Sequence, residues 1–209
     1  MENKTELELI KTNLRRYTFE SPKIKKWVED NSKGKCLNLF AGKTKLNIDE
    51  IRNDLDKTML ANFHKDAVDF VKEYKGKKFD TIILDPPYAY RKSMEMYNGN
   101  KASRFKMLAD LIPNILKDNG IVISFGYHST FLSKKRNAIL TKLCVFAHSG
   151  SQHCTIGIIE QLNSGFHFLS SISCSINSFA FSSVISFFPA LNINIKSLLN
   201  CASLISILN

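Results

Sequence analysis

The chain has 209 residues, of which 44% are hydrophobic, so it can bury the core of one ordinary domain but leaves no room for a second large one. Its formal charge of +10 and pI near 9.4 favour a polyanionic partner, because each Lys or Arg placed on a phosphate releases a condensed counterion. The five cysteines include no CxxC pair and no signal peptide precedes them, which is typical of a reducing, cytoplasmic protein with no stable membrane association.

The first 160 residues alternate between helical and strand patterns. Ser21-Pro22 predicts a helix start, with Ser as the cap and Pro at the first helical position, running through Trp27 to about Asp30. Apolar runs predict buried parallel strands, and apolar residues at helical spacing predict helices between them. The predicted strands are 35–40, 79–84 and 121–125, and the predicted helices are 66–74 and 101–117.

The last predicted elements are strands at 143–147 and 155–159, separated by a polar segment that favours an antiparallel hairpin. The alternation predicts an α/β fold: a doubly wound, mostly parallel sheet closed by this hairpin and complete by Glu160. His148, His153 and Cys154 fall in or beside the hairpin, which we prefer to a zinc site because structural zinc needs closely paired ligands. No metal is expected.

The composition changes after residue 160. Every charged residue except Lys196 precedes residue 161, and residues 161–209 are dominated by Ser, Phe, Ile, Leu and Asn without a sustained period. Three interpretations compete for this tail. Frequent Ser and Asn argue against a membrane segment; the others are an added packing or oligomerisation element and a tail foreign to the domain, produced by frameshift or read-through, which we favour. The predicted domain is therefore 1–160, with 161–209 as an atypical tail.

One loop carries the strongest chemical signal, because it follows the apolar run 81–84 directly. Its four residues are Asp85, Pro86, Pro87 and Tyr88. An amino nitrogen conjugated to a base ring is a poor nucleophile, and fixed acceptors can bias it toward sp³ geometry. The Asp85 carboxylate and the Pro86 carbonyl can act as these acceptors, and Tyr88 offers a flat face for an extruded base. The alternative is a Pro-rich turn whose Asp caps a neighbour.

This loop resembles the Asp/Asn-Pro-Pro-aromatic motif of the Rossmann-like S-adenosylmethionine-dependent amino-methyltransferases, and the subgroup that matches best is the adenine-N6 DNA methyltransferases. The run 37–42, Leu-Asn-Leu-Phe-Ala-Gly, resembles the first motif of that class, where the backbone bends closely around the methionine part of the cofactor. The resemblance covers residues from about Phe19 to Glu160. It implies S-adenosylmethionine as the cofactor.

The resemblance also implies the residues that bind this cofactor. In the family, one acid after the second strand holds the ribose and another after the third lies near the adenine ring. Asp54 matches the first, with Glu50 as a rival, and Asp66 matches the second. Solvated surface acids are the alternative for both. The full expected set is Phe40, Ala41, Gly42, Asp54, Asp66 and Asp85.

The chain departs from the family after Gly42. A second glycine is missing from Gly42-Lys43-Thr44, and too few residues separate Gly42 from Asp54 for the usual full helix. GxxxxGK is also absent, which excludes a phosphate loop for nucleoside triphosphates. The local geometry around the cofactor is therefore expected to differ from the family's.

Basic and aromatic residues follow the Asp85 loop. Tyr90, Arg91 and Tyr97, together with Tyr88, are the expected substrate-binding residues, because this mixture suits phosphate contacts plus base stacking. A solvent-facing loop with chance aromatics is the alternative. Residues 125–128 could line the base pocket, and the basic run 134–136 could contact phosphates.

The resemblance implies methyl transfer to the N6 amino group of adenine in DNA. An RNA methyltransferase acting on guanine N2 or adenine N6 is the second candidate, because the chain has no room for a DNA target-recognition domain. This lack also implies a specificity subunit or an oligomer, or low sequence selectivity. The third candidate is a degenerate cofactor- or nucleic-acid-binding module without turnover. A small-molecule or protein-glutamine substrate fits the basic charge less well.

Overall fold

The computed structural model describes residues 4–86, 101–126, 129–149 and 154–163, with the backbone alone for 101–103. All of them lie in the first of the two units into which the chain divides, Met1–Phe166. The elements in chain order are β1 (Glu6–Thr12), η1 (Thr18–Glu20), α1 (Pro22–Asn31), β2 (Cys36–Asn38), β3 (Glu50–Arg52), α2 (Ala67–Glu73), β4 (Phe79–Leu84), α4 (Lys101–Ile115), β5 (Leu116–Gly126), η2 (Lys134–Arg136), β6 (Ala138–His148) and β7 (Cys154–Leu162).

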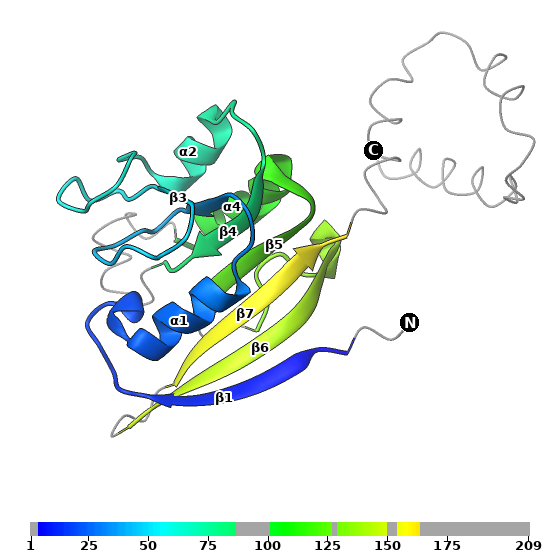
Figure 1. The fold of residues 1–209 in the computed structure, drawn as a ribbon. Helices are drawn as coiled ribbons and strands as arrows, with labels where there is room; N and C mark the ends of the chain where they lie inside the picture. The colour runs from blue at the N-terminus through cyan, green and yellow to red at the C-terminus, as the bar shows by residue number, and fades with distance from the viewer. Residues whose placement is uncertain (1–3, 87–100, 127–128, 150–153, 164–209) are drawn as a thin grey trace, which may run out of the picture. The chain divides into compact units, whose positions relative to one another are not determined.

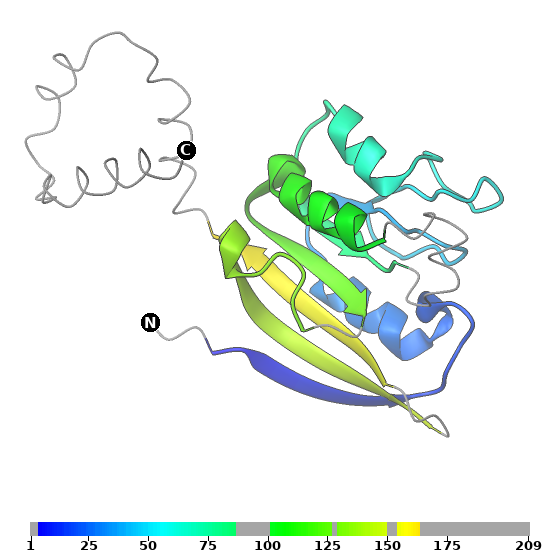
Figure 2. The ribbon, with the colours of Figure 1, turned by 180° about the vertical axis from the view of Figure 1, so that it is seen from behind.

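The strands form one seven-stranded sheet in the order β1-β6-β7-β5-β4-β2-β3. All neighbouring pairs are parallel except those of β7, which runs antiparallel to both β5 and β6. Helix α1 covers one face of the sheet and α4 covers the other (Figures 1 and 2). The predicted doubly wound sheet with a closing antiparallel hairpin is confirmed.

Both faces of the sheet are buried, and the side chains of β4 show why its sequence is apolar without interruption. Ile82 and Leu84 belong to the core cluster that includes α2 and α4, whereas Ile83 between them belongs to the cluster that includes α1. Successive strand residues point to opposite faces, so a strand covered on both sides must be apolar at every position. This is the pattern that predicted the strand at 79–84.

The N-terminal segment forms a strand that was not among the elements predicted from the sequence. It forms β1, an edge strand paired in parallel with β6 from Glu6↔Lys142 to Thr12↔His148. Only one of its faces meets a helix: Ile10 packs on the core below α1, whereas Leu7 and Leu9 are 74% and 68% exposed. A strand with one exposed face and charged residues on the other gives a weak apolar signal.

Other boundaries shift by a few residues. The strand predicted at 35–40 ends at Asn38, and β5 begins at Leu116 where the helix α4 stops. The predicted hairpin is confirmed, with β6 and β7 in register from Ala138↔Leu162 to Ala147↔Cys154. Because β7 continues to Leu162, a domain that ended at Glu160 would lack two residues of β7 that pair with β6. The domain boundary itself stays a prediction.

In the described part of the chain, no helix is both long and apolar enough to cross a membrane.

The described cysteines differ in their expected reactivity. Burial raises the pKa of the Cys36 thiol to about 11 and that of Cys144 to about 12, whereas Cys154 is exposed at the start of β7. Since the thiolate is the nucleophile, iodoacetamide at about pH 8 should alkylate Cys154 roughly 10²-fold faster than the two buried thiols. Peptide mass spectrometry after timed labelling measures the rates, and labelling in urea is the control. Equal rates in the folded protein would contradict this burial.

Candidate active site

The two predicted motifs leave the sheet at neighbouring strand ends. β2 and β4 are parallel neighbours, with Asn38 opposite Ile83, and the Leu39 amide donates to the Ile83 carbonyl at 3.1 Å. The segment from Phe40 to Gly42 and the segment Asp85-Pro86 therefore emerge side by side at the carboxyl edge of the sheet. Ligands of open α/β sheets bind at this edge. Asp85 and Pro86 are both half-buried.

The structure tests only the start of the predicted catalytic loop. Five of the predicted catalytic and substrate-binding residues lie outside the described residues, namely Pro87, Tyr88, Tyr90, Arg91 and Tyr97. Their roles stay predictions, whereas the position of Asp85 directly after β4 is observed.

Gly42 adopts a left-handed backbone conformation with φ of +56°. A Cβ atom added to it would meet nothing within 4 Å, so the space in front of this turn is open. The Gly42 amide donates to Asp54 Oδ2 at 2.7 Å. The structure thus brings together two residues that the sequence assigned to the same cofactor.

Asp54 and its rival Glu50 have different surroundings. Asp54 follows β3 and also accepts from the Asp56 amide at 2.9 Å. The Glu50 side chain is only 1% exposed, forms an ion pair with Arg52 at 2.8 Å and accepts from the Leu46 amide at 3.0 Å. Glu50 is therefore occupied inside the protein, and Asp54 is the acid placed at the carboxyl edge.

Arg52 is a residue of the site that the sequence analysis missed. It is 4% exposed, and its guanidinium donates to the carbonyls of the turn after β2 and of the loop after β3. Its carbonyl acceptors are Gly42 at 2.9 Å, Thr44 at 2.9 Å, Leu60 at 2.7 Å and Ala41 at 3.2 Å. A signal was present: Glu50 and Arg52, two apart on a strand, point to the same face, and opposite charges so placed can pair.

Arg52 also explains how the shortened segment keeps a defined shape. Residues 39–49, all of them described, contain no helix, in agreement with the expectation that the segment is too short for one. A helix would satisfy its own carbonyl groups, but an irregular turn cannot. Here the planar guanidinium supplies those hydrogen bonds, and the Glu50 carboxylate balances its charge.

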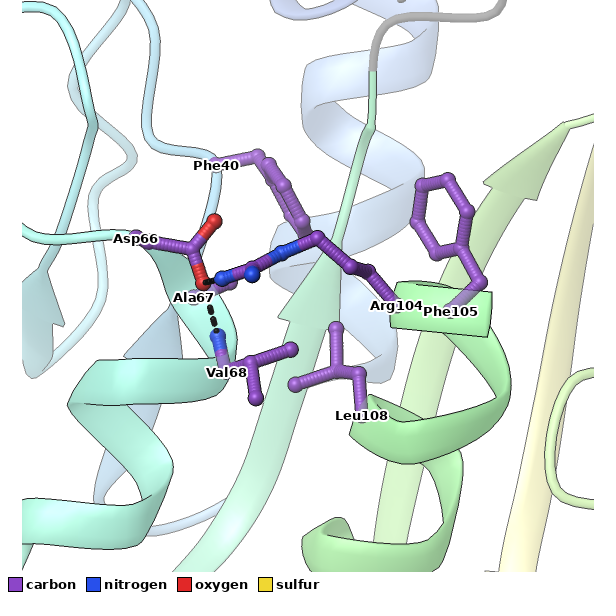
Figure 3. Close-up of a pocket in the computed structure, with 7 residues that line it drawn as sticks. All are labelled: Phe40, Asp66, Ala67, Val68, Arg104, Phe105 and Leu108. Atoms are coloured by element: carbon purple, nitrogen blue, oxygen red, sulfur yellow. Dashed lines mark hydrogen bonds and ion pairs between the residues drawn. The ribbon is translucent and has the colours of Figure 1, made fainter. Parts of the chain in front are cut away.

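Asp66 lies at the N-terminus of α2 and acts as its cap. Its Oδ1 accepts from the Val68 amide at 2.9 Å and the Asp69 amide at 3.3 Å, and it pairs with the Arg104 guanidinium of α4. The carboxylate thereby ties the starts of two helices together at the carboxyl edge, as Figure 3 shows. Arg104 was not singled out from the sequence, because its partner lies 38 residues away.

A pocket opens beside Asp66. It lies between Phe40 and the N-terminal turns of α2 and α4 (Figure 3), and its lining consists of Phe40, Asp66, Ala67, Val68, Arg104, Phe105 and Leu108. The Phe40 and Phe105 rings lie 6.5 Å apart between centroids, at 37° to each other. The walls are mostly apolar and aromatic, and the paired Asp66 carboxylate and Arg104 guanidinium are the charged groups among the lining residues.

The structure places the residues of two secondary expectations away from the Asp85 edge or inside the core. Phe125 does not line a base pocket: it is 4% exposed and packs against Phe19 and Trp27 below α1. The basic run 134–136 forms η2 just before β6, at the opposite edge of the sheet from Asp85, and Arg136 pairs there with Asp110. Tyr127 and His128 lie outside the described residues.

Glu160 positions the loop after β5 and was also missed. It is 1% exposed, and its carboxylate accepts three backbone amides, from Phe131, Leu132 and Ser133, each at 2.8 Å. Ser133 has φ of +62°, an uncommon conformation for a residue with a Cβ. The buried carboxylate therefore fixes a strained turn, and the apolar strand around Glu160 gave no reason to expect it.

The hairpin that competed with a zinc site has its own polar contact. His148 Nε2 and Thr155 Oγ1 lie 2.8 Å apart across β6 and β7. Among the described residues, no three His, Cys, Asp or Glu side chains are grouped so that they could hold a metal ion.

No protein-family model matches the chain, and no curated protein matches it at a significant level. Solved structures do. TrmN from Thermus thermophilus matches with 15% identity and a TM-score of 0.52, over 70% of this chain and 50% of that one. The N-methyltransferase NodS from Bradyrhizobium japonicum WM9 matches with 9% identity and a TM-score of 0.52, over 72% of this chain and 99% of that one. At these identities the likeness concerns the fold, and the chain has a class I methyltransferase fold.

Proposed function

We propose that the protein is an S-adenosylmethionine-dependent methyltransferase that modifies the exocyclic N6 amino group of adenine in DNA. One observation carries the proposal: the Gly42 turn and the Asp85-Pro86 segment leave adjacent parallel strands side by side. The first matches the family's cofactor motif and the second its catalytic motif, so a methyl donor and an amino acceptor would meet between them. The class I methyltransferase fold supports methyl transfer in general.

The residues around Gly42 fit the proposed cofactor. The open space in front of the Gly42 turn would receive its methionine part, and Asp54, beside the turn, would accept from the ribose hydroxyls. The apolar walls of the Phe40 pocket would hold the adenine ring, with Asp66 at its rim. S-adenosylmethionine supplies an electrophilic methyl group on a sulfonium.

Asp85 and Pro86 would act on the acceptor. The Asp85 carboxylate and the Pro86 carbonyl each accept one N–H of the target amino group, which withdraws the nitrogen lone pair from the ring and directs it out of the ring plane. Tyr88 would stack on the base, and Tyr90, Arg91 and Tyr97 would contact the strand around it. Amine acidity rises as the new N–C bond forms, so Asp85 is also placed to accept the departing proton.

RNA is the second candidate substrate, and the lengths of the described connections favour it. The segments joining β2 to β3 and β3 to α2 are short loops that leave no room for a separate DNA-recognition domain. Guanine N2 and adenine N6 are both exocyclic amino groups, so the same Asp85-Pro86 acceptors would serve either base. TrmN, whose chain is twice as long as the matched region, shares the fold.

Transfer of labelled methyl from S-adenosylmethionine to unmodified DNA and RNA, followed by nucleoside identification, tests the proposal. N6-methyladenine in DNA supports it, and a methylated base in RNA alone moves the function to the second candidate. Cofactor binding without a methylated product in either polymer would instead indicate a binding module.

Gly42→Ala should abolish most cofactor binding without unfolding the protein. The left-handed conformation costs an alanine about 1 kcal/mol, and the added methyl meets no protein atom within 4 Å. It would instead stand in the space proposed for the cofactor. We expect the dissociation constant for S-adenosylmethionine, measured by calorimetry, to rise by roughly 10²-fold, about 2.7 kcal/mol.

Gly34→Ala is the matched control, because Gly34 has a similar φ of +55°. Its Cβ would lie 2.4 Å from the Asp80 carboxylate, which Lys117 and the Lys35 amide hold in place. This variant should lose about 2–4 kcal/mol of stability from strain plus overpacking, yet bind the cofactor normally while folded. Normal cofactor affinity in Gly42→Ala would argue against the proposed site.

A further inference from the structure

A basic segment follows β1 at the carboxyl edge of the sheet. Residues 13–16 are exposed, and they include Arg15 and Arg16. The Arg16 guanidinium lies over the Tyr17 ring, 5.7 Å from its centroid. Cationic and aromatic groups thus share one exposed surface. β1 is an edge strand of the sheet, and four other strands separate it from β2, which leads to the Gly42 turn.

Packing places this segment near the proposed catalytic residues. Thr12 and Ser21, which flank it, share a hydrogen bond of 2.6 Å between their hydroxyl groups. Phe19 packs edge-on against Phe125 at 5.5 Å, and the next residue, Gly126, ends β5. Because Ser124 of β5 lies opposite Leu84 of β4, Phe19 is anchored close to the strand end from which Asp85 emerges. Figures 1 and 2 both show the connection from β1 to α1 running along this edge.

The Gly42 turn contributes two more cations to the same edge. Lys43 and Lys45 are exposed, whereas Leu46 is buried in the core cluster that also contains Phe19. The side chains of Arg15, Arg16, Lys43 and Lys45 form no ion pair with any residue that the structure describes.

From this arrangement we infer that Arg15, Arg16, Lys43 and Lys45 form a docking surface for the phosphate backbone of the nucleic-acid substrate. The inference rests on the proposed function, which it extends from the reacting base to the strand that carries it. Arginine binds phosphate through two parallel hydrogen bonds, and the Tyr17 ring with Arg16 provides a stacking platform for a neighbouring base. Arg15 and Arg16 follow β1 on one side of β4, and Lys43 and Lys45 follow β2 on the other side. A nucleic-acid strand bound to all four residues would therefore pass the Gly42 turn and the catalytic segment that begins at Asp85.

Salt dependence distinguishes phosphate contacts from general attraction by a basic protein. The test compares Arg15→Ala/Arg16→Ala with Lys77→Ala/Lys78→Ala, which removes two exposed charges just before β4, at the opposite edge. Binding of a labelled single-stranded DNA oligonucleotide is measured by fluorescence anisotropy over a series of KCl concentrations. Loss of two phosphate contacts should reduce the slope of log Kobs against log salt by about 1.4, since each contributes about 0.7 on a single strand.

The control variant should keep the wild-type slope, and both variants should bind S-adenosylmethionine as wild type does. Equal slopes for wild type and Arg15→Ala/Arg16→Ala, or an equal loss in the control, would overturn the docking surface. So would a wild-type protein that binds no oligonucleotide. The proposed function fails separately, when wild type yields no methylated base. The same series with RNA of matching sequence reports which polymer the surface prefers.

Discussion

Asp85→Ala should lower kcat of methyl transfer by roughly 10²–10³-fold, the usual cost of losing one preorganised group that acts on the reacting atoms. Asp85 follows β4 at the carboxyl edge, beside the turn proposed to hold the methyl donor. The resemblance also assigned Asp85 to the cofactor, but in the proposed mechanism its carboxylate acts on the amino acceptor. The dissociation constant for S-adenosylmethionine should therefore change by less than about threefold, under ~0.7 kcal/mol. Single-turnover transfer of labelled methyl and calorimetric titration measure the two quantities.

Asp85→Asn separates geometry from charge. The amide oxygen can still accept one N–H of the target, and the family motif admits Asn at this position, so we expect a rate between those of wild type and Asp85→Ala. Asp118→Ala removes an exposed carboxylate at the opposite edge and should leave both quantities unchanged. Wild-type turnover in Asp85→Ala would refute the mechanism, and a parallel loss of cofactor affinity would assign Asp85 to the cofactor instead.

The parts of the fold predicted from sequence are those whose patterns are local. β4 is buried on both faces, so its apolar run is uninterrupted, and the loop that follows it could be placed at the ligand-binding edge. Asp66 could be placed at the start of a helix because it precedes an amphipathic segment, and it caps α2. The neighbouring positions of the Gly42 and Asp85 segments follow from the parallel pairing of their strands.

The parts that were missed depend on partners distant in sequence. β1 is recognisable only through its pairing with β6, some 136 positions along the chain, as in Glu6↔Lys142. Glu160 satisfies amides 27–29 residues before it, and Asp66 pairs with Arg104 across two helices. A single sequence carries no signal for such contacts, because each residue is ordinary for its local surroundings. The turn after β2 is only partly similar. Its short length and the spacing of Glu50 and Arg52 were visible in the sequence, but the carbonyl groups that the Arg52 guanidinium also binds were not.

Arg52→Met should have the largest effect on stability, lowering the free energy of unfolding by about 3–5 kcal/mol, the usual cost of removing one partner of a buried ion pair. The substitution leaves the Glu50 carboxylate, 1% exposed, without its cation. It also leaves the carbonyls of Ala41, Gly42, Thr44 and Leu60 without their donor. Equilibrium unfolding in urea, fitted with the slope as a free parameter, measures the change.

Lys26→Met is the control for losing an ion pair at the surface. Lys26 and Asp30 are 75% and 57% exposed on α1, so their interaction should contribute no more than about 0.5 kcal/mol to stability.

Arg52→Lys retains the charge but not the planar fork, and one ammonium cannot reach carbonyls on both loops. We therefore expect Arg52→Lys to recover part of the stability yet to bind S-adenosylmethionine more weakly than wild type, since the Gly42 turn would no longer be fixed. If Arg52→Lys matched wild type in both measurements, charge alone would hold the turn. If Arg52→Met lost under about 1 kcal/mol, well below the range for a buried pair, water would have replaced the guanidinium and the turn would be stable without it.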